Sequence, residues 1–135
     1  MANLAEQPGQ RRPASRVAAE TRLEGPTVSK VLKTLARAGL IESVRGVHGG
    51  YRLRVEPRQI SVASIIRAME GPIALTECAL EPGLCSHEHD CSLKGNWQRI
   101  GETVEQALES LTLADLAAPR KPGLKIINRT ESRPA

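Results

Sequence analysis

Residues 24–55 constrain the fold more than any other part of the chain. The segment opens with EGP, and proline is favoured in the first turn of a helix, so a helix is predicted from Pro26 to Ala38. Gly39 is expected to end it. Its apolar residues recur every three or four positions and therefore share one face. They are Val28, Val31, Leu32 and Leu35, opposite Thr27, Ser29, Lys30, Lys33, Thr34 and Arg37.

A hairpin is predicted after this helix. Residues 41–45 and residues 51–55 each show the two-residue alternation of side chains that is typical of a strand. The glycine-rich stretch 46–50 separates the two segments. A shorter helix is expected at 14–23, begun by Pro13, with Val17, Ala18 and Leu23 facing inward. Two helices followed by such a hairpin form a winged helix-turn-helix. The expected fold is therefore mainly α (α+β), with a two-stranded wing.

The distribution of charge favours DNA as the partner of the N-terminal part. Residues 1–55 carry ten Lys and Arg against four Asp and Glu, whereas residues 56–118 carry four against ten. On the second helix, Thr27, Ser29 and Lys30 are placed for base edges in the major groove. Lys30 also belongs to the set expected to neutralise phosphates, with Lys33 and Arg37. Wing residues expected to enter the minor groove or clamp the backbone are Arg45, His48 and Arg52.

All three cysteines of the chain lie within fourteen residues: Cys78, Cys85 and Cys91. An odd number cannot pair completely into disulfides, and clustered cysteines in the cytosol more often bind metal or do redox chemistry. The spacing C-x6-C-x5-C is wider than the C-x-x-C of structural zinc sites. Thiolates at such spacing suit both iron–sulfur clusters and zinc. His87 or His89 is a candidate fourth ligand.

Two further helices are predicted around the cysteine loop. One is capped by Ser61 and runs to Met69, with Ile65, Ile66 and Met69 buried. The second runs from about Leu93 to Ser110, and a last short turn is capped by Thr112 and Asp115. Since the chain has no Phe, one Trp and one Tyr, its aliphatic core is marginal for a monomer. The apolar stripe of the long helix is therefore expected to pack against a second subunit, through Trp97, Ile100, Val104, Ala107, Leu108 and Leu111.

Together these motifs resemble the Rrf-type winged-helix transcription regulators, which include IscR, NsrR and SufR-like proteins. The resemblance covers roughly residues 3–118 and is carried by four segments. They are EGPTVSKVLKTLARAGLIESVRGVHGGYRL, ISVASIIRAMEGPIALTEC, the three cysteines and GNWQRIGETVEQALESLTLADL. Within the family, EGPIALTEC and GNW are most similar to regulators of SUF-type iron–sulfur cluster assembly.

The resemblance implies a homodimeric regulator that binds a palindromic site on double-stranded promoter DNA. It implies an iron–sulfur cluster, [2Fe-2S] or [4Fe-4S], held by Cys78, Cys85 and Cys91. Some members add a histidine three residues after the last cysteine, a position that Lys94 occupies here; others add an acidic residue from the partner's first helix. Family members begin with a longer helix, so the first helix is expected to be truncated or to start upstream.

The predicted organisation is a winged helix-turn-helix domain at 1–58 and a connecting helix with the cysteine loop at 59–92. A dimerisation helix at 93–118 and a disordered tail at 119–135 follow. Without a long apolar run or a signal peptide, the chain is expected to be cytoplasmic and to have no membrane partner. The alternative is a structural zinc-binding winged-helix module that binds DNA or protein. A redox enzyme using Cys85 or Cys91 fits worst, because there is no C-x-x-C or cofactor fingerprint.

Overall fold

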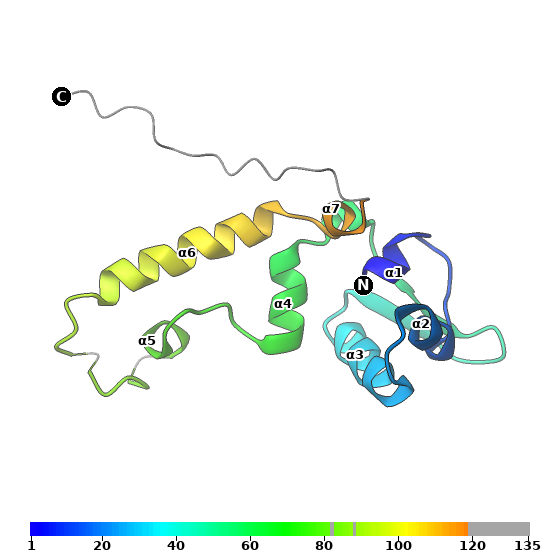
Figure 1. Cartoon of the computed structure of the whole chain (residues 1–135), viewed down its shortest axis with the longest axis horizontal. Coiled ribbons are helices and arrows are strands. Elements are labelled where there is room, and N and C mark those ends of the chain that lie inside the picture. Colours follow the sequence, from blue (N-terminus) through cyan, green and yellow to red (C-terminus); the bar gives the residue numbers. More distant parts are fainter. Residues whose placement is uncertain (82, 88, 119–135) are drawn as a thin grey trace, which may run out of the picture.

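The computed structural model describes residues 1–81, 83–87 and 89–118, so the expected disordered tail at 119–135 lies outside the described residues. A rounded N-terminal part contains the first helices and the hairpin, and one long helix extends away from it (Figure 1). In chain order the elements are α1 (Ala2–Ala5), α2 (Ala14–Thr21), α3 (Gly25–Arg37), β1 (Ile41–Val44), β2 (Gly50–Leu53), a 3-10 turn η1 (Pro57–Gln59), α4 (Val62–Glu70), α5 (Glu77–Leu80), α6 (Lys94–Ser110) and α7 (Leu113–Ala117).

The helix predicted from residue 26 is α3, and its ends are those that the sequence indicates. Pro26 lies in its first turn, and Gly39 follows the helix in a left-handed conformation with φ of 75°. The Gly39 amide donates to the Ala36 carbonyl at 3.0 Å, and the Leu40 amide donates to the Leu35 carbonyl at 3.1 Å. These bonds satisfy carbonyls at the helix end and direct the chain into β1. The buried face consists of Val28, Leu32 and Leu35.

Helix α2 is shorter than predicted. It ends at Thr21 because Arg22 takes a left-handed conformation with φ of 57°, and the chain then turns into α3. Val17 is buried and Ala18 packs against the core, as expected. Leu23, expected to face inward, is instead exposed, because the helical periodicity that would direct it to the core stops before it.

The hairpin pairs β1 with β2 in antiparallel register, with Ile41 opposite Leu53. A feature absent from the prediction is a bridge from the loop before α2: Arg12 and Tyr51 exchange backbone hydrogen bonds of 2.9 Å in both directions. Gly50 permits this approach, because a Cβ atom there would lie 2.7 Å from the Arg12 carbonyl oxygen. The base of the wing is therefore fixed to the segment that precedes α2.

The side chain of Arg12 is buried, which the sequence did not indicate. Only 3% of it is exposed, and its Nη1 lies 2.6 Å from Glu20 of α2. Glu20 also accepts hydrogen bonds from Arg16 and Asn3. These bonds, that from Arg16 first, lower the pKa of Glu20. The buried guanidinium is thus paired, as a charge removed from water requires.

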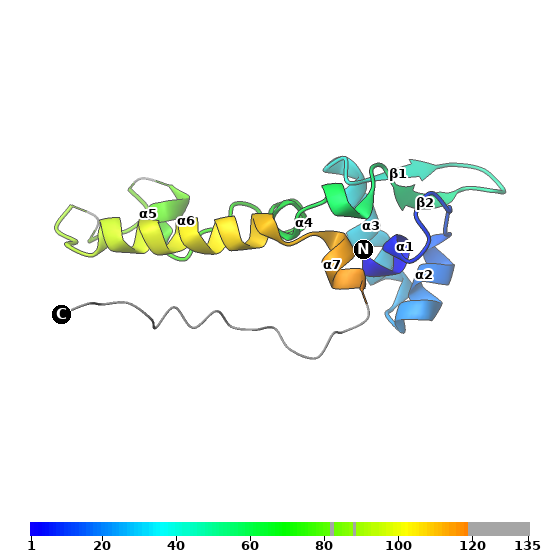
Figure 2. The same ribbon diagram turned by 90° about the horizontal axis from the view of Figure 1, so that it is seen from above.

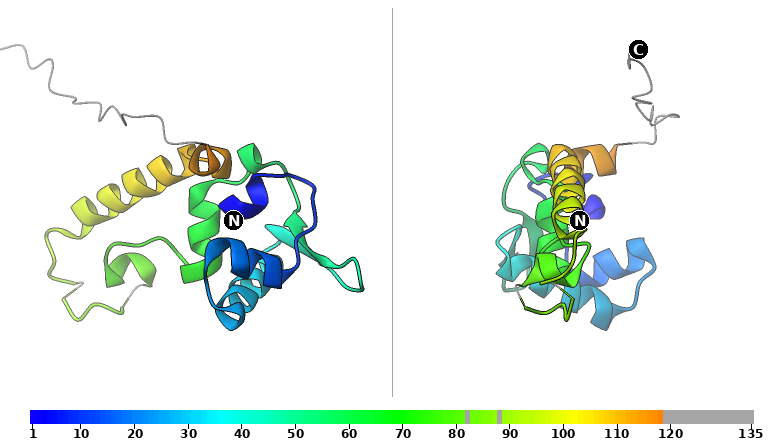
Figure 3. Two further views of the ribbon diagram at one scale, coloured as in Figure 1. Left: turned by 45° about the vertical axis from the view of Figure 1, so that its right-hand side comes forward. Right: turned by 90° about the vertical axis from the view of Figure 1, so that its left-hand side faces the viewer.

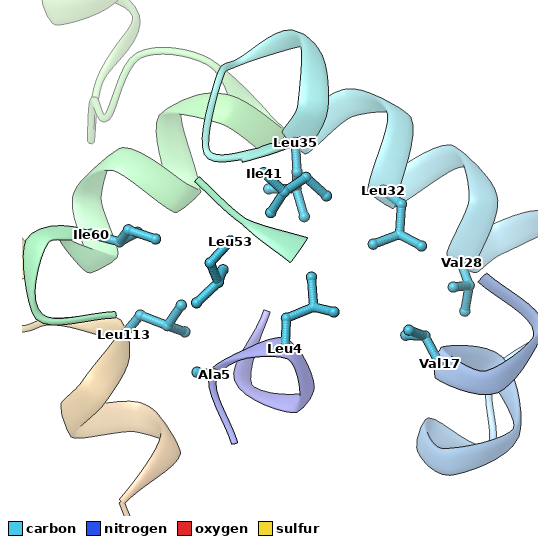
Figure 4. Close-up of a cluster of buried hydrophobic side chains, with 10 residues drawn as sticks. All are labelled: Leu4, Ala5, Val17, Val28, Leu32, Leu35, Ile41, Leu53, Ile60 and Leu113. Atoms are coloured by element: carbon cyan, nitrogen blue, oxygen red, sulfur yellow. The ribbon is translucent and has the colours of Figure 1, made fainter. Parts of the chain in front are cut away.

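The core joins the two ends of the described chain. Leu4 of α1 and Leu113 of α7 lie in one cluster with Leu53 and Ile60 (Figure 4). Helix α7 is held there by a hydrogen bond from the Leu113 amide to the Ile60 carbonyl, 2.8 Å long. The complete buried cluster is Leu4, Ala5, Val17, Val28, Leu32, Leu35, Ile41, Leu53, Ile60 and Leu113.

Helix α4 starts as predicted, with the Ser61 hydroxyl accepting from the Ser64 amide at 3.1 Å. Of its three predicted buried residues, Ile65 packs against the core, whereas the prediction is wrong for Met69. Ala63 is the enclosed side chain, Ile65 and Ile66 are half-buried, and Met69 is exposed. The reason is that α4 lies between α3 and α6, so its C-terminal half bridges two parts of the molecule (Figure 3).

Candidate nucleic-acid interface and cysteine loop

Helix α3 presents a polar, basic face on the side opposite its buried one. The exposed side chains on it are Thr27, Lys30, Lys33 and Arg37, and Ser29 is half-buried. Burial of Val28, Leu32 and Leu35 fixes which face turns outward, because residues three and four apart lie on one side of a helix. All five predicted positions of this helix thus belong to one structural surface.

The tip of the wing is a tight turn over residues 46–49. The Gly49 amide donates to the Gly46 carbonyl at 2.9 Å. Gly46 has φ of 109°, and a Cβ atom at Gly49 would lie 2.4 Å from the Val44 carbonyl oxygen. Arg45 and His48 are exposed at this tip. The loop that joins β1 and β2 projects beyond the helices (Figure 2).

Arg52 differs from the other predicted wing residues. It lies directly opposite Glu42 in the hairpin register, and its Nε donates to the Glu42 carboxylate. The structure therefore places Arg52 in an ion pair on the strands rather than at the tip. Both side chains are more than a third exposed, so the pair is accessible to solvent.

The three cysteines are free thiols on the segment between α4 and α6. Cys78 lies in the short helix α5, where its Sγ is 3.3 Å from the Thr76 hydroxyl. Cys85 is half-buried, and Cys91 is exposed just before α6. His87 and His89 are exposed on the same segment. Over residues 1–81, 83–87 and 89–118, no three His, Cys, Asp or Glu side chains converge into a metal-binding group.

The donor chemistry of this loop nevertheless fits an iron–sulfur cluster. Three unpaired thiols are available, and cysteine thiolates are the usual ligands of such clusters. All three thiols lie on one segment between α4 and α6, and none is in a disulfide. Three residues would therefore hold the group in this chain: Cys78, Cys85 and Cys91.

A hollow of about 420 Å³ lies beside Cys78, between α5 and α6. Two carboxylates of α6, Glu102 and Glu105, line it, and the sequence had not singled out either residue. Their spacing of three residues places them on one face of α6. That face could have been recognised from the sequence, but its position beside Cys78 depends on the turn between α4 and α5.

Helix α4 is joined to α6 by ion pairs. Arg67 Nη2 lies 2.7 Å from Glu105, and it also donates to Glu109. Hydrogen bonds from Ser61 and from Arg67 lower the pKa of Glu109. The cap of α4 and the last turns of α6 are therefore linked by side chains. This link connects the winged part of the molecule to its long helix.

The apolar stripe of α6 is exposed in the single chain. Trp97 and Ile100 are 43% and 46% exposed, and Val104 is also exposed, while Leu108 is half-buried. A hollow of about 430 Å³ runs along this helix over Ile100 and Val104.

No helix in the described part of the chain is both long and apolar enough to cross a membrane.

Two helices leading into a two-stranded wing, followed by a cysteine loop and a long amphipathic helix, define a winged-helix protein of the transcription-regulator class. The chain belongs to the Rrf2 family, described as iron-dependent transcriptional regulators, whose model matches residues 1–119. This confirms the resemblance found in the sequence. It also places the chain among regulators rather than enzymes.

Individual relatives support the same assignment. The HTH-type transcriptional regulator CymR of Bacillus subtilis (strain 168) is 38% identical over 91 residues, which are 67% of this chain and 61% of CymR. The chain thus spans about three fifths of that relative. The structure of CymR (YrzC), the global cysteine regulator of B. subtilis, matches with a TM-score of 0.69 and 33% identity, over 86% of this chain and 85% of that one. IscR of T. potens matches with a TM-score of 0.64 and 32% identity, over 85% and 75%.

Proposed function

We propose that the chain is a DNA-binding transcription regulator whose α3 enters the major groove while the wing contacts the neighbouring minor groove. The observation that carries the proposal is the basic outer face of α3, which the core orients away from the molecule. Thr27, Ser29 and Lys30 near the start of α3 are assigned to base edges. Lys33 and Arg37 are assigned to phosphates, and Arg45 and His48 to the groove beside the wing.

We further propose that the regulator is a homodimer formed through α6. The exposed side chains Trp97, Ile100 and Val104, with Leu108, would be covered by the same helix of a second copy. A two-fold dimer matches a palindromic site with half-sites about one helical turn apart. Replacing Ile100 with Glu is expected to give a monomer in sedimentation, whereas Leu75→Glu, equally exposed but in the cysteine segment, serves as the control.

The cysteine loop is proposed to hold an iron–sulfur cluster, with His87 or His89 as a candidate fourth ligand. When bound, the cluster is a redox-sensitive group, and it is lost on exposure to oxidants or when iron is scarce. The chain's own contribution is ligation by Cys78, Cys85 and Cys91, and a connection from the loop through α6 to Arg67 of α4. A cytoplasmic regulator of SUF-type cluster-assembly genes, responding to cluster, iron or oxidant status, is the role that the motifs EGPIALTEC and GNW support.

The test of DNA binding is a fluorescence-anisotropy titration with a duplex selected from a random-sequence pool by the wild-type chain. Binding through α3 and the wing predicts a steep loss of affinity with rising salt, because phosphate contacts release counterions. The double variant Lys33→Ala, Arg37→Ala removes the two residues assigned to phosphates, so it is expected to weaken binding and to reduce the salt slope by about two. Wild-type affinity that does not depend on salt would contradict the proposal.

A further inference from the structure

The wing tip carries an apolar side chain that has no role in the fold. Val47 is 97% exposed, more than any other large apolar residue among the described ones. It occupies one of the two central positions of the turn 46–49, and His48 occupies the other. A valine in this place contributes nothing to the core.

The turn itself does not need valine either. Turn positions favour Gly, Pro, Asn, Asp and Ser, each for a backbone reason, and a β-branched residue supplies none of these. The shape of the tip is fixed by Gly46 and Gly49, because a Cβ atom at Gly49 would lie within 2.4 Å of the Val44 carbonyl oxygen. Residues that break a local preference without a packing gain are expected at functional sites, and the exposed side chain of Val47 is free to contact a partner outside the chain.

The surroundings of Val47 define the chemistry of that partner. Arg45 and His48 flank it and are exposed, and residues 41–55 contain three Arg and one Glu. That single carboxylate, Glu42, is already paired with Arg52. The tip therefore combines a small apolar group with a cationic rim. A matching surface has apolar walls bordered by anions.

The minor groove of DNA is such a surface. Deoxyribose C–H groups form its walls, phosphates border it, and a width of about 6 Å admits a two-residue turn. The side chain of valine is stiff about χ1, so it loses little freedom on binding. Complete burial of its isopropyl group corresponds to a factor of roughly ten or more in an equilibrium constant.

We propose that Val47 is a minor-groove contact residue, whose isopropyl group packs against the sugar walls while Arg45 and His48 interact with the phosphates and the groove floor. The inference rests on the proposed DNA-binding function and adds a specificity residue to it. An apolar contact to sugars reads groove width rather than base identity. Val47 therefore favours sites whose wing-contacted flank has a narrow minor groove, as in A-tracts.

The test uses the full chain and the pool-selected duplex in two versions that differ only in the flanks, an A-tract or a G·C-rich segment. Val47→Ser is expected to weaken binding to the A-tract version about five- to tenfold and to change the G·C-rich version much less. Val47→Ile should keep the preference. Val55→Ser, which changes a valine outside the tip, is the matched control and should bind as wild type.

A second readout is hydroxyl-radical footprinting, because these radicals remove hydrogen from deoxyribose in the minor groove. The wild type should protect sugars in the flank, and Val47→Ser should lose that protection while it keeps the half-site footprint and an unchanged salt slope. Unchanged affinity and footprint in Val47→Ser would overturn the inference and point to a protein partner for the tip. Absence of salt-dependent DNA binding by the wild type would instead overturn the proposed function.

Discussion

The guanidinium of Arg67 lies 2.7 Å from the carboxylate of Glu105, and this contact joins α4 to α6. Glu105 also lines the hollow beside Cys78, so one residue faces both the cysteine segment and the helix that leads back to the winged part. This arrangement gives the cysteine loop a physical connection to the proposed DNA-binding surface.

Replacing Arg67 with Gln should lower the melting temperature slightly at low salt. The Arg67 and Glu105 side chains are 40% and 36% exposed, and ion pairs of this kind are weak and screened by ions. The difference between variant and wild type should therefore vanish at about 1 M salt. Thermal melts followed by circular dichroism test this. A difference that persists at high salt would show that Arg67 acts through packing instead.

Stability should fall on acidification. The pKa values of Glu20, Glu109 and Asp115 are all lowered in the folded chain, below the ordinary values of 4.5 for Glu and 3.8 for Asp. A lowered carboxyl pKa contributes stability that is present above the unfolded pKa and is lost as the pH falls through the folded pKa. Melting temperatures should thus decrease as the pH falls below about pH 4.

Asp115→Asn tests one of these carboxylates separately. The pKa of Asp115 is lowered first by the hydrogen bond from the Thr112 side chain and then by that from its backbone amide. The variant should have a shallower decrease at acid pH than the wild type. Identical pH profiles would mean that the capping box of α7 contributes nothing in solution.

Leu113→Ala should destabilise the winged part of the molecule, although Leu113 follows the long helix in sequence. The side chain is 1% exposed and packs in the cluster that contains Leu4 and Ile60. Such a truncation costs about 2–5 kcal/mol. The matched control is Leu116→Ala on the same helix, which is 56% exposed and should change stability by no more than about 0.5 kcal/mol. Equal effects in urea denaturation would contradict the packing described.

Lys30→Ala and Arg37→Ala should have different effects on DNA binding. Lys30 lies near the start of α3 and is assigned to base edges, so its removal should relax sequence preference by about 1–3 kcal/mol. Arg37 lies in the last turn and is assigned to a phosphate, so its removal should weaken all duplexes alike and reduce the salt slope by about one. Competition titrations with several duplexes measure both effects. Intact binding of Lys30→Ala on every sequence would refute the groove assignment.

The sequence predicted the elements whose signals are local. The Ser61 cap, the Thr112–Asp115 capping box and the Gly39 end of α3 are all formed, because each depends on residues within one turn. The predicted hairpin is also formed, although its strands are Ile41–Val44 and Gly50–Leu53 rather than 41–45 and 51–55.

What the sequence did not predict depends on contacts between distant segments. The bridge of Arg12 to Tyr51 has no periodic pattern, and the burial of Leu113 depends on the return of α7 to the first helix. The placement of Glu102 and Glu105 beside Cys78 likewise results from the course of the chain after α4. Ligation by the three cysteines stays a prediction, since their side chains do not converge in the described residues.

The measurement that tests the account most directly is an anaerobic visible absorption spectrum with iron and sulfide analysis. It would be made on the wild-type chain and on Cys85→Ser. An iron–sulfur cluster held by Cys78, Cys85 and Cys91 predicts broad charge-transfer absorption with matching iron and sulfide in the wild type, and loss of both in the variant. A colourless wild type with stoichiometric zinc would contradict it and favour the structural-metal alternative.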